Sequence, residues 1–131
     1  MSVELTMLVY ATALLIVLVL IQALAGIRAN GLATQAGPRD NLPPVQTFHG
    51  RASRTVDNHR EGLLMFAPLV LVAAVMDIST RLTILGAQLF FWSRVAHAVL
   101  YLAGVPWLRA AAWGVGMAGI VLVLLGVLGL A

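Results

Sequence analysis

Two groups of polar side chains recur at helical spacing inside an otherwise apolar chain. The first polar row, at positions i, i+4 and i+7, consists of Arg54, Asn58 and Glu61. The second polar row, at positions i, i+3 and i+7, consists of Arg94, His97 and Tyr101. Residues at these spacings share one face of a helix. Because arginine binds carboxylates through paired hydrogen bonds, two such rows facing each other could hold an anionic ligand.

The charges around the two rows do not balance. The cations in and beside them are Arg28, Arg51, Arg54, Arg94 and Arg109, whereas the acids are Asp57 and Glu61. An anionic ligand from the cytoplasm would offset this excess. An alternative is that Arg94, whose insertion into a membrane costs about 2.5–3.5 kcal/mol, pairs with Glu61 and only fixes the register of two helices. The spacing alone leaves both interpretations open.

Other polar residues have less specific interpretations. His59 and Arg60 fall off the first polar row, and we expect them to point away from it toward lipid headgroups. His97 by itself is typical of a hydrogen-bonded interior histidine, and Arg109 beside Trp107 is typical of an anchor at the membrane interface. The three histidines lie on different elements and the chain has no cysteine, so no zinc site is expected.

The composition indicates which solvent surrounds these rows. Hydrophobic residues make up 61% of the 131 residues and charged residues 10%, and the mean hydropathy is +0.98. A soluble domain carries about 25% charged residues, so this chain has too little polar surface to face water all round. Its net charge of +3 does not indicate nucleic-acid binding, because the arginines lie between and inside apolar segments. We therefore expect an integral membrane protein.

Apolar segments predict an all-α, four-helix transmembrane bundle in a single domain of residues 1–131. The expected helices cover residues of about 5–27, 51–76, 81–102 and 108–130, and the main loop covers residues 31–50. The first segment follows Glu4 and no cation, and it is longer than the apolar part of a signal peptide. We expect it to be a retained helix.

The arginines also predict the orientation in the membrane. With four spans, the first and third connections share one side. The arginines on that side are Arg28, Arg39, Arg51, Arg54 and Arg109, and the other side has Arg81. Arginine-rich connections tend to stay in the cytoplasm. Both termini should therefore be non-cytoplasmic, and both polar rows should lie near the cytoplasmic face.

Two strings of residues resemble the MAPEG family, the membrane-associated proteins of eicosanoid and glutathione metabolism. The string from Arg51 to Glu61, RASRTVDNHRE, is similar to the family signature R-x-x-R-x-x-x-N-x-x-E. The string from Arg94 to Tyr101, RVAHAVLY, is similar to the R-V-A-H-x-x-x-Y segment of the family's prostaglandin E synthase branch and its bacterial relatives. Four apolar segments in matching positions extend the resemblance over nearly the whole chain, as in a bacterial-type member similar to the microsomal glutathione transferases.

The resemblance implies a homotrimer of four-helix subunits that binds glutathione between subunits, at the cytoplasmic end. Family members conjugate glutathione to lipophilic electrophiles, reduce lipid hydroperoxides or isomerise endoperoxides, which implies a substrate that enters from membrane lipid. The implied glutathione contacts are Arg28, Arg54, Asn58, Glu61, Arg94, His97 and Tyr101. The implied catalytic residue is Arg109, which would hold the thiol as a thiolate.

Three positions depart from the prostaglandin E synthase pattern. Asp57 stands in place of an arginine, Ala110 in place of a serine and Trp113 in place of a tyrosine. Prostaglandin synthesis is therefore not expected, and thiolate stabilisation would rest on Arg109 alone. Two further interpretations remain open. One is a non-enzymatic membrane protein that binds lipid or another ligand, and the other is a structural trimer whose polar residues only bond helices together.

Overall fold

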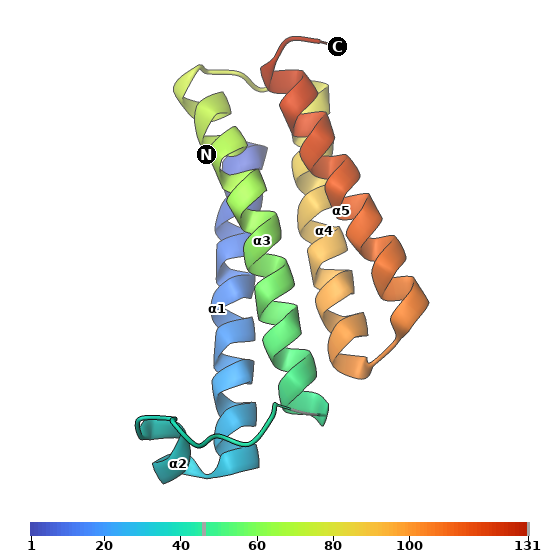
Figure 1. The fold of residues 1–131 in the computed structure, drawn as a ribbon. Coiled ribbons are helices and arrows are strands. Elements are labelled where there is room, and N and C mark those ends of the chain that lie inside the picture. Colours follow the sequence, from blue (N-terminus) through green and yellow to red (C-terminus); the bar gives the residue numbers. More distant parts are fainter. Residues whose placement is uncertain (46, 131) are drawn as a thin grey trace.

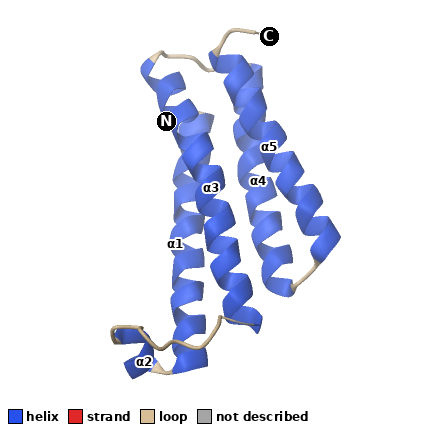
Figure 2. Ribbon diagram, viewed as in Figure 1, coloured by secondary structure: helices blue, strands red, loops and turns tan. Residues whose placement is uncertain are grey.

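The computed structural model describes residues 1–45 and 47–130, and these residues form five α-helices and no strand (Figure 2). The helices are α1 (Val3–Asn30), α2 (Leu32–Ala36), α3 (Thr47–Val75), α4 (Arg81–Ala103) and α5 (Pro106–Val127). The prediction of an all-helical chain is confirmed. The predicted domain of residues 1–131 also includes residues 46 and 131, which lie outside the described residues.

The four long helices lie side by side, and helices that follow each other in the chain run in opposite directions (Figure 1). Both chain ends lie at one end of this arrangement, and the short helix α2 lies at the other. The first helix, α1, packs against α3 and α4, whereas α5 packs mainly against α4. The two helices that carry the polar rows, α3 and α4, are in contact.

The connection after α1 differs from the prediction. The sequence predicted a loop over residues 31–50, but this stretch contains α2 and the start of α3, which begins at Thr47 instead of near residue 51. Gly31 has a φ of +83°, a backbone conformation that glycine adopts readily, so the chain can turn and start a new helix at once. Gly37 and Pro38 then follow the end of α2.

Local residues define both ends of α4. Thr80 and Thr83 form a reciprocal capping box at its start, and Gly104 ends it with a φ of +79°. Pro106 opens α5, because a proline in the first turn lacks only an N–H group that would have no helical partner there. The last helix therefore begins before the predicted start near residue 108.

Apolar side chains and glycines hold the long helices together. The main core cluster comprises Met7, Ala11, Leu63, Phe66, Val70, Ala87, Phe90, Phe91, Ile120 and Val123. The rings of Phe66 and Phe90 stack with centroids 4.1 Å apart, which joins α3 to α4. The backbones of α4 and α5 approach closely, since a methyl group placed on Gly119 would lie 2.6 Å from the carbonyl oxygen of Gly86.

A buried carboxylate joins α1 to the start of α4, at the end of the molecule that holds both termini. Glu4 is almost fully buried and accepts hydrogen bonds from the hydroxyls of Thr83 and Ser79. Such bonds are required because a buried carboxylate without partners is costly. Glu4 and Ala11 are seven residues apart and therefore share one face of α1. This face packs against α3 and α4.

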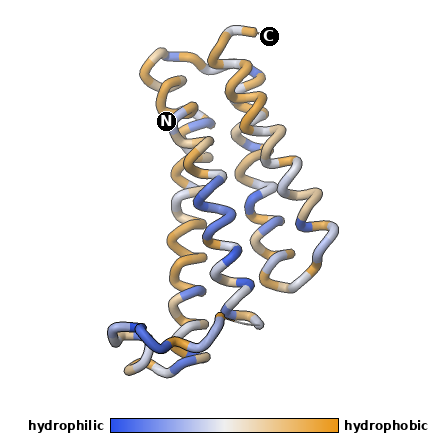
Figure 3. Tube along the Cα trace, in the orientation of Figure 1, coloured by the Kyte–Doolittle hydropathy of each residue, from blue (hydrophilic) through white to orange (hydrophobic). Residues whose placement is uncertain are grey.

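Among the described residues, two helices are long and apolar enough to cross a membrane, namely α1 and α5. Both expose large apolar side chains, such as Leu24 on α1 and Val121 on α5. The middle of α3 is hydrophilic, although this helix has 29 residues (Figure 3). Two helices thus fit insertion into a membrane, and the four-span arrangement with its orientation stays a prediction.

Candidate functional site

The packing of α3 against α4 brings the two polar rows together. The Arg94 Nη2 group donates a hydrogen bond to Asn58 Oδ1 over 2.6 Å. The Arg54 Nε group donates to the Tyr101 hydroxyl over 3.1 Å. Each of these bonds joins a residue of one row to a residue of the other. The prediction that the rows face each other is therefore confirmed.

Arg94 lies at the centre of this contact and is 3% exposed. Its Nε group donates to His59 Nδ1 and its Nη2 group donates to His97 Nδ1, each over 3.4 Å. With Asn58 as the third acceptor, all its hydrogen-bond partners within the described residues are uncharged side chains. The guanidinium is thus buried and hydrogen-bonded, but it has no counter-ion in this part of the chain.

The predicted pair of Arg94 and Glu61 does not form. Glu61 is exposed on α3 and takes part in no ion pair within residues 1–45 and 47–130. The ion pair that these residues do form joins Arg60 Nη2 to Asp57 Oδ1 over 2.8 Å, on the exposed side of α3. The hypothesis that Glu61 forms an ion pair with the buried Arg94 within one chain is therefore wrong, because Arg94 donates its hydrogen bonds to Asn58, His59 and His97 instead.

His59 is buried, although the polar row predicted that it would point toward lipid headgroups. It is 1% exposed, and its Nε2 lies 2.8 Å from the carbonyl oxygen of Ala11 on α1. The prediction was wrong because it used only the polar row as the inward face of α3. The apolar half of the helix contains the pattern that would have predicted the burial of His59. Phe66, seven residues after His59, is fully buried on the same face. Arg60 is exposed, as expected.

A group of arginines surrounds a cavity of about 200 Å³ between α3 and the turn that joins α4 to α5. We call this space the arginine cavity, and its lining residues are Arg51, Arg54, Tyr101, Gly104, Pro106 and Arg109. None of them is acidic. The Arg109 guanidinium lies 4.3 Å from the centroid of the Tyr101 ring. Three cations therefore meet in one place, with an aromatic side chain between two of them.

The arginine cavity and Arg94 are neighbours along α4. Arg94, His97 and Tyr101 occupy successive turns, and the rings of His97 and Tyr101 are in edge contact with centroids 5.5 Å apart. The facing residues of α3 follow the same order, because Arg54 bonds to Tyr101 and Asn58 bonds to Arg94. The candidate site is thus one strip, with a buried cation at one end and a more exposed group of cations at the other.

Arg51 lines the strip, although the sequence did not assign it to the site. It precedes Arg54 by three residues and therefore lies on the same side of α3. Its Nε group donates to the Leu102 carbonyl oxygen over 3.1 Å, which holds the side chain against the end of α4. The spacing from Arg54 was the signal that would have identified it.

Two predicted contacts, Arg28 and Glu61, are not brought into the strip by a single chain. Arg28 is exposed at the end of α1 and lines a separate cavity with Phe48 and His49. Glu61 is exposed on α3. The remaining predicted contacts and Arg109 all lie in the strip, and the roles assigned to Arg28 and Glu61 stay predictions.

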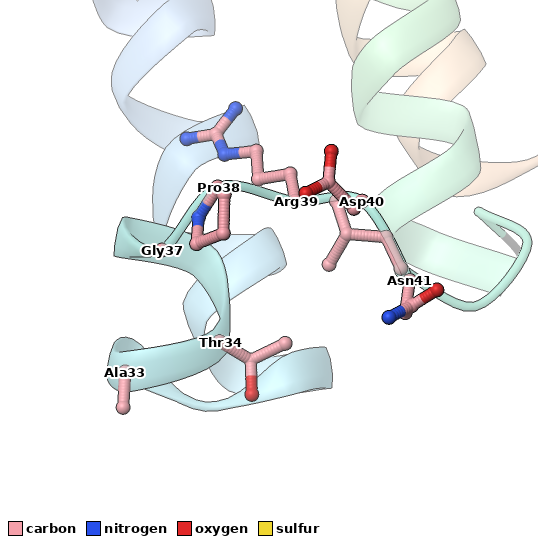
Figure 4. Close-up of a pocket in the computed structure, with 8 residues that line it drawn as sticks. Ala33, Thr34, Gly37, Pro38, Arg39, Asp40 and Asn41 are labelled. Atoms are coloured by element: carbon pink, nitrogen blue, oxygen red, sulfur yellow. The ribbon is translucent and has the colours of Figure 1, made fainter.

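A further cavity lies in the segment that follows α1, and Figure 4 shows the side chains around it. It is formed by α2 and the loop after it, and its charged lining residues are Arg39 and Asp40. No predicted site residue lines it. Within the described residues, no group of three or more histidine, cysteine, aspartate or glutamate side chains could hold a metal ion. The arginines of the strip are groups that could hold an anionic cofactor.

Comparison with known protein families matches residues 6–129 to the MAPEG family. The chain belongs to the MAPEG family. This family consists of membrane proteins and includes glutathione transferases. The match covers nearly the whole chain, so the predicted membership of the MAPEG family is confirmed. No curated protein and no solved structure matches this MAPEG protein.

Proposed function

We propose that this MAPEG protein is a glutathione-dependent membrane transferase or peroxidase that acts on lipophilic electrophiles or lipid hydroperoxides. The arginine cavity supports this most, because Arg51, Arg54 and Arg109 surround a space that no acidic residue lines. Glutathione would bring two carboxylates and a thiol to such a site. Arginine binds carboxylates through two parallel hydrogen bonds, and nearby cations favour a thiolate over a thiol.

Arg109 is our candidate for the residue that stabilises the thiolate. Its guanidinium lies against the Tyr101 ring and lines the arginine cavity, so its N–H groups are available to a ligand there. The Tyr101 hydroxyl accepts a hydrogen bond from Arg54 and still has its own proton to donate to a carboxylate of the ligand. A fixed cation beside the sulfur would lower the free energy of the thiolate.

Two reactions follow from a stabilised thiolate. In the transferase reaction the sulfur forms a bond to an electrophilic carbon, and the leaving group departs with the electron pair of the bond that breaks. In the peroxidase reaction the sulfur attacks the terminal oxygen of a hydroperoxide and the O–O bond breaks. A second glutathione then completes the reduction, and the products are the alcohol, water and glutathione disulfide. Glutathione supplies the thiol in both reactions, since the chain has no cysteine.

The exposed positions of Arg28 and Glu61 support a site that a neighbouring subunit completes. We propose a homotrimer with glutathione between subunits, in which Arg28 reaches the ligand across the interface and Glu61 meets the glutathione amine. The substrate would enter from membrane lipid. We also propose that the site faces the cytoplasm of a bacterial inner membrane with both termini outside, because arginine-rich connections are retained in the cytoplasm.

Substitution of Arg109 tests the proposed chemistry. Arg109→Ala should lower the conjugation of glutathione to chlorodinitrobenzene by about a hundredfold or more, because loss of one charge-stabilising donor costs about 10²–10³ in rate. Arg109→Lys keeps the charge but loses the planar fork, so it should retain part of the activity. Arg81→Ala removes an exposed arginine at the opposite end of α4 and should leave the rate unchanged. Wild-type activity in the Arg109→Ala protein would refute the role of Arg109.

A non-enzymatic ligand-binding protein is the second candidate function. Ala110 and Trp113 favour it, because both are exposed, lie outside the arginine cavity and supply no hydroxyl beside Arg109. Under either function, glutathione or a similar anion should raise the unfolding temperature of the detergent-solubilised protein. Stabilisation without conjugation or peroxide reduction would select the second candidate. Absence of stabilisation would count against glutathione as the ligand.

A further inference from the structure

The buried guanidinium of Arg94 is oriented entirely by neutral groups, which is unusual for a charged side chain that is 3% exposed. Its acceptors are Asn58 Oδ1, His59 Nδ1 and His97 Nδ1. None of these atoms carries a negative charge. The groups that hold Arg94 by hydrogen bonds therefore orient its guanidinium without neutralising it.

The hydrogen bonds of His59 determine where its proton lies. The Ala11 carbonyl oxygen can only accept, so His59 Nε2, which is 2.8 Å away, must carry the hydrogen. Arg94 Nε can only donate, so His59 Nδ1, which is 3.4 Å away, must be bare. His59 is thus the neutral Nε2–H tautomer, and both of its ring nitrogens are occupied.

His59 links three helices through one ring. It belongs to α3, its Nε2 side is anchored to the backbone of α1 at Ala11, and its Nδ1 side meets Arg94 of α4. A guanidinium is planar, so bonds at both Nε and Nη2 set the orientation of the whole group. The third nitrogen, Nη1, has no hydrogen-bond partner among residues 1–45 and 47–130. The ring of His59 therefore sets the direction in which Arg94 presents its free edge.

We propose that His59 is a positioning residue for Arg94: anchored to Ala11, it holds the guanidinium so that the Nη1 edge meets a carboxylate of glutathione. The identity of the ligand rests on the proposed function, whereas the orientation of Arg94 does not. A carboxylate in place of His59 would also accept from Nε, but it would neutralise the cation and compete with the ligand. A neutral imidazole orients the charge and leaves it intact.

Two matched substitutions separate the two hydrogen bonds of His59. In His59→Asn, the amide oxygen can take the place of Nδ1 and accept from Arg94, while the bond to Ala11 is lost. In His59→Gln, the amide nitrogen can take the place of Nε2 and donate to Ala11, while the bond to Arg94 is lost. Both variants keep a polar side chain and lose one bond, so a general loss of stability should affect them alike.

Nitrogen NMR of arginine- and histidine-labelled protein in detergent tests the positioning without a ligand. The wild type should give a slowly exchanging Nε–H signal for Arg94, assigned by its absence in Arg94→Lys, and the imidazole shifts of the Nε2–H tautomer for His59. The Arg94 signal should persist in His59→Asn and exchange rapidly in His59→Gln. A protected signal in His59→Gln, or an Nδ1–H tautomer in the wild type, would overturn the proposal.

Glutathione affinity tests the consequence for the ligand. The dissociation constant should rise roughly tenfold to a hundredfold in His59→Gln and less than about threefold in His59→Asn. The kcat at saturating glutathione should change little, because Arg109 is untouched, and this split distinguishes positioning from general damage. Unchanged affinity in His59→Gln would overturn the positioning role. Failure of the wild type to bind glutathione would instead refute the proposed function, and the NMR result would still decide what orients Arg94.

Discussion

Tyr101 contacts two arginines of the strip, Arg54 and Arg109. Its hydroxyl accepts a hydrogen bond from Arg54, its ring faces the Arg109 guanidinium, and its edge contacts the ring of His97. Contact with an aromatic face stabilises a cation by about 0.5–1 kcal/mol at an exposed site, and it also keeps the cation close to the ring. Tyr101 is thus expected to serve ligand binding through its hydroxyl and thiolate stabilisation through its ring.

Substitutions of Tyr101 should separate these two contributions. Tyr101→Phe keeps the ring under Arg109 and removes the oxygen that Arg54 bonds, so the dissociation constant of glutathione should rise by about threefold to tenfold, as expected for one hydrogen bond of about 1 kcal/mol. Tyr101→Leu also removes the ring, and kcat should then fall because Arg109 loses its support. Calorimetric titration and a conjugation assay measure the two quantities. If the Phe and Leu variants have the same kcat, the ring does not position Arg109.

Helical periodicity alone identified the two polar rows, because the faces of a helix follow directly from its repeat. It did not identify His59 or the neutral surroundings of Arg94. Both depend on how α3 is rotated between α1 and α4, and this rotation comes from packing such as the stacking of Phe66 on Phe90. The expected ion pair of Arg94 and Glu61 is also absent from the described residues, since a shared helix face does not say which side chains of two facing rows come within bonding distance.

At the scale of elements, the contact between α4 and α5 supports the strip. These helices form the most extensive contact in the molecule, and they carry Arg94, Tyr101 and Arg109 between them. Their close approach requires glycine, because a methyl group at Gly119 would lie 2.6 Å from the Gly86 carbonyl oxygen and 2.8 Å from the Phe90 backbone nitrogen. Backbone atoms cannot rotate away as a flexible side chain can.

Alanine substitutions at two glycines of α5 should therefore have opposite effects. Gly119→Ala should lower the free energy of unfolding by about 1–3 kcal/mol, because the new methyl group overpacks the contact between α4 and α5. Gly114→Ala meets open space, and it should leave stability unchanged or raise it by up to about 1 kcal/mol through higher helix propensity. Thermal unfolding in detergent compares the two variants. Equal unfolding temperatures would mean that α4 and α5 can move apart without a loss of stability.

The long helices could be predicted from the sequence because apolar segments of membrane length leave few alternatives. The short helix α2 could not, since five residues are too few to show a periodic pattern. The early start of α5 was signalled only by Pro106, whose preference for a first helical turn competes with its frequency in loops. The start and end of a helix thus had to be predicted from single residues, whereas the presence of a long helix could be predicted from a long stretch of apolar residues.

At the scale of the whole molecule, α3 exposes charges near its middle, which the predicted four-span arrangement would bring into contact with lipid in a lone chain. Arg60 is 13 residues after Thr47 and 15 before Val75, so it lies near the middle of the helix. Figure 3 shows that the middle of α3 is hydrophilic. Arg60 and its partner Asp57 are both largely exposed. A charge at the centre of a membrane helix costs about 2.5–3.5 kcal/mol on insertion scales, so if α3 spans the membrane as predicted, this face should be covered by protein.

An apolar groove beside Arg60 is a surface against which another protein segment can pack and so cover these charges. Its other lining residues are Thr12, Leu15, Leu63, Leu64, Ala67, Pro68 and Leu71. It lies between α1 and α3. Glu61, which follows Arg60 in the chain, is exposed and has no counter-ion among the residues described. A second copy seated here would cover the ion pair and bring Glu61 to an interface, which is what the proposed glutathione site between subunits requires.

We therefore expect the detergent-solubilised protein to be a homotrimer whose copies meet at this face of α3. Native mass spectrometry should give the mass of three copies of the 13.9-kDa chain. The chain has no cysteine, so a single cysteine reports on one position. A short bis-maleimide should cross-link Leu64→Cys, on the exposed face beside Arg60, and should leave Val121→Cys on α5 largely monomeric. A monomeric mass, or equal cross-linking at both positions, would mean that lipid or detergent, and not a second copy, faces the Asp57–Arg60 pair.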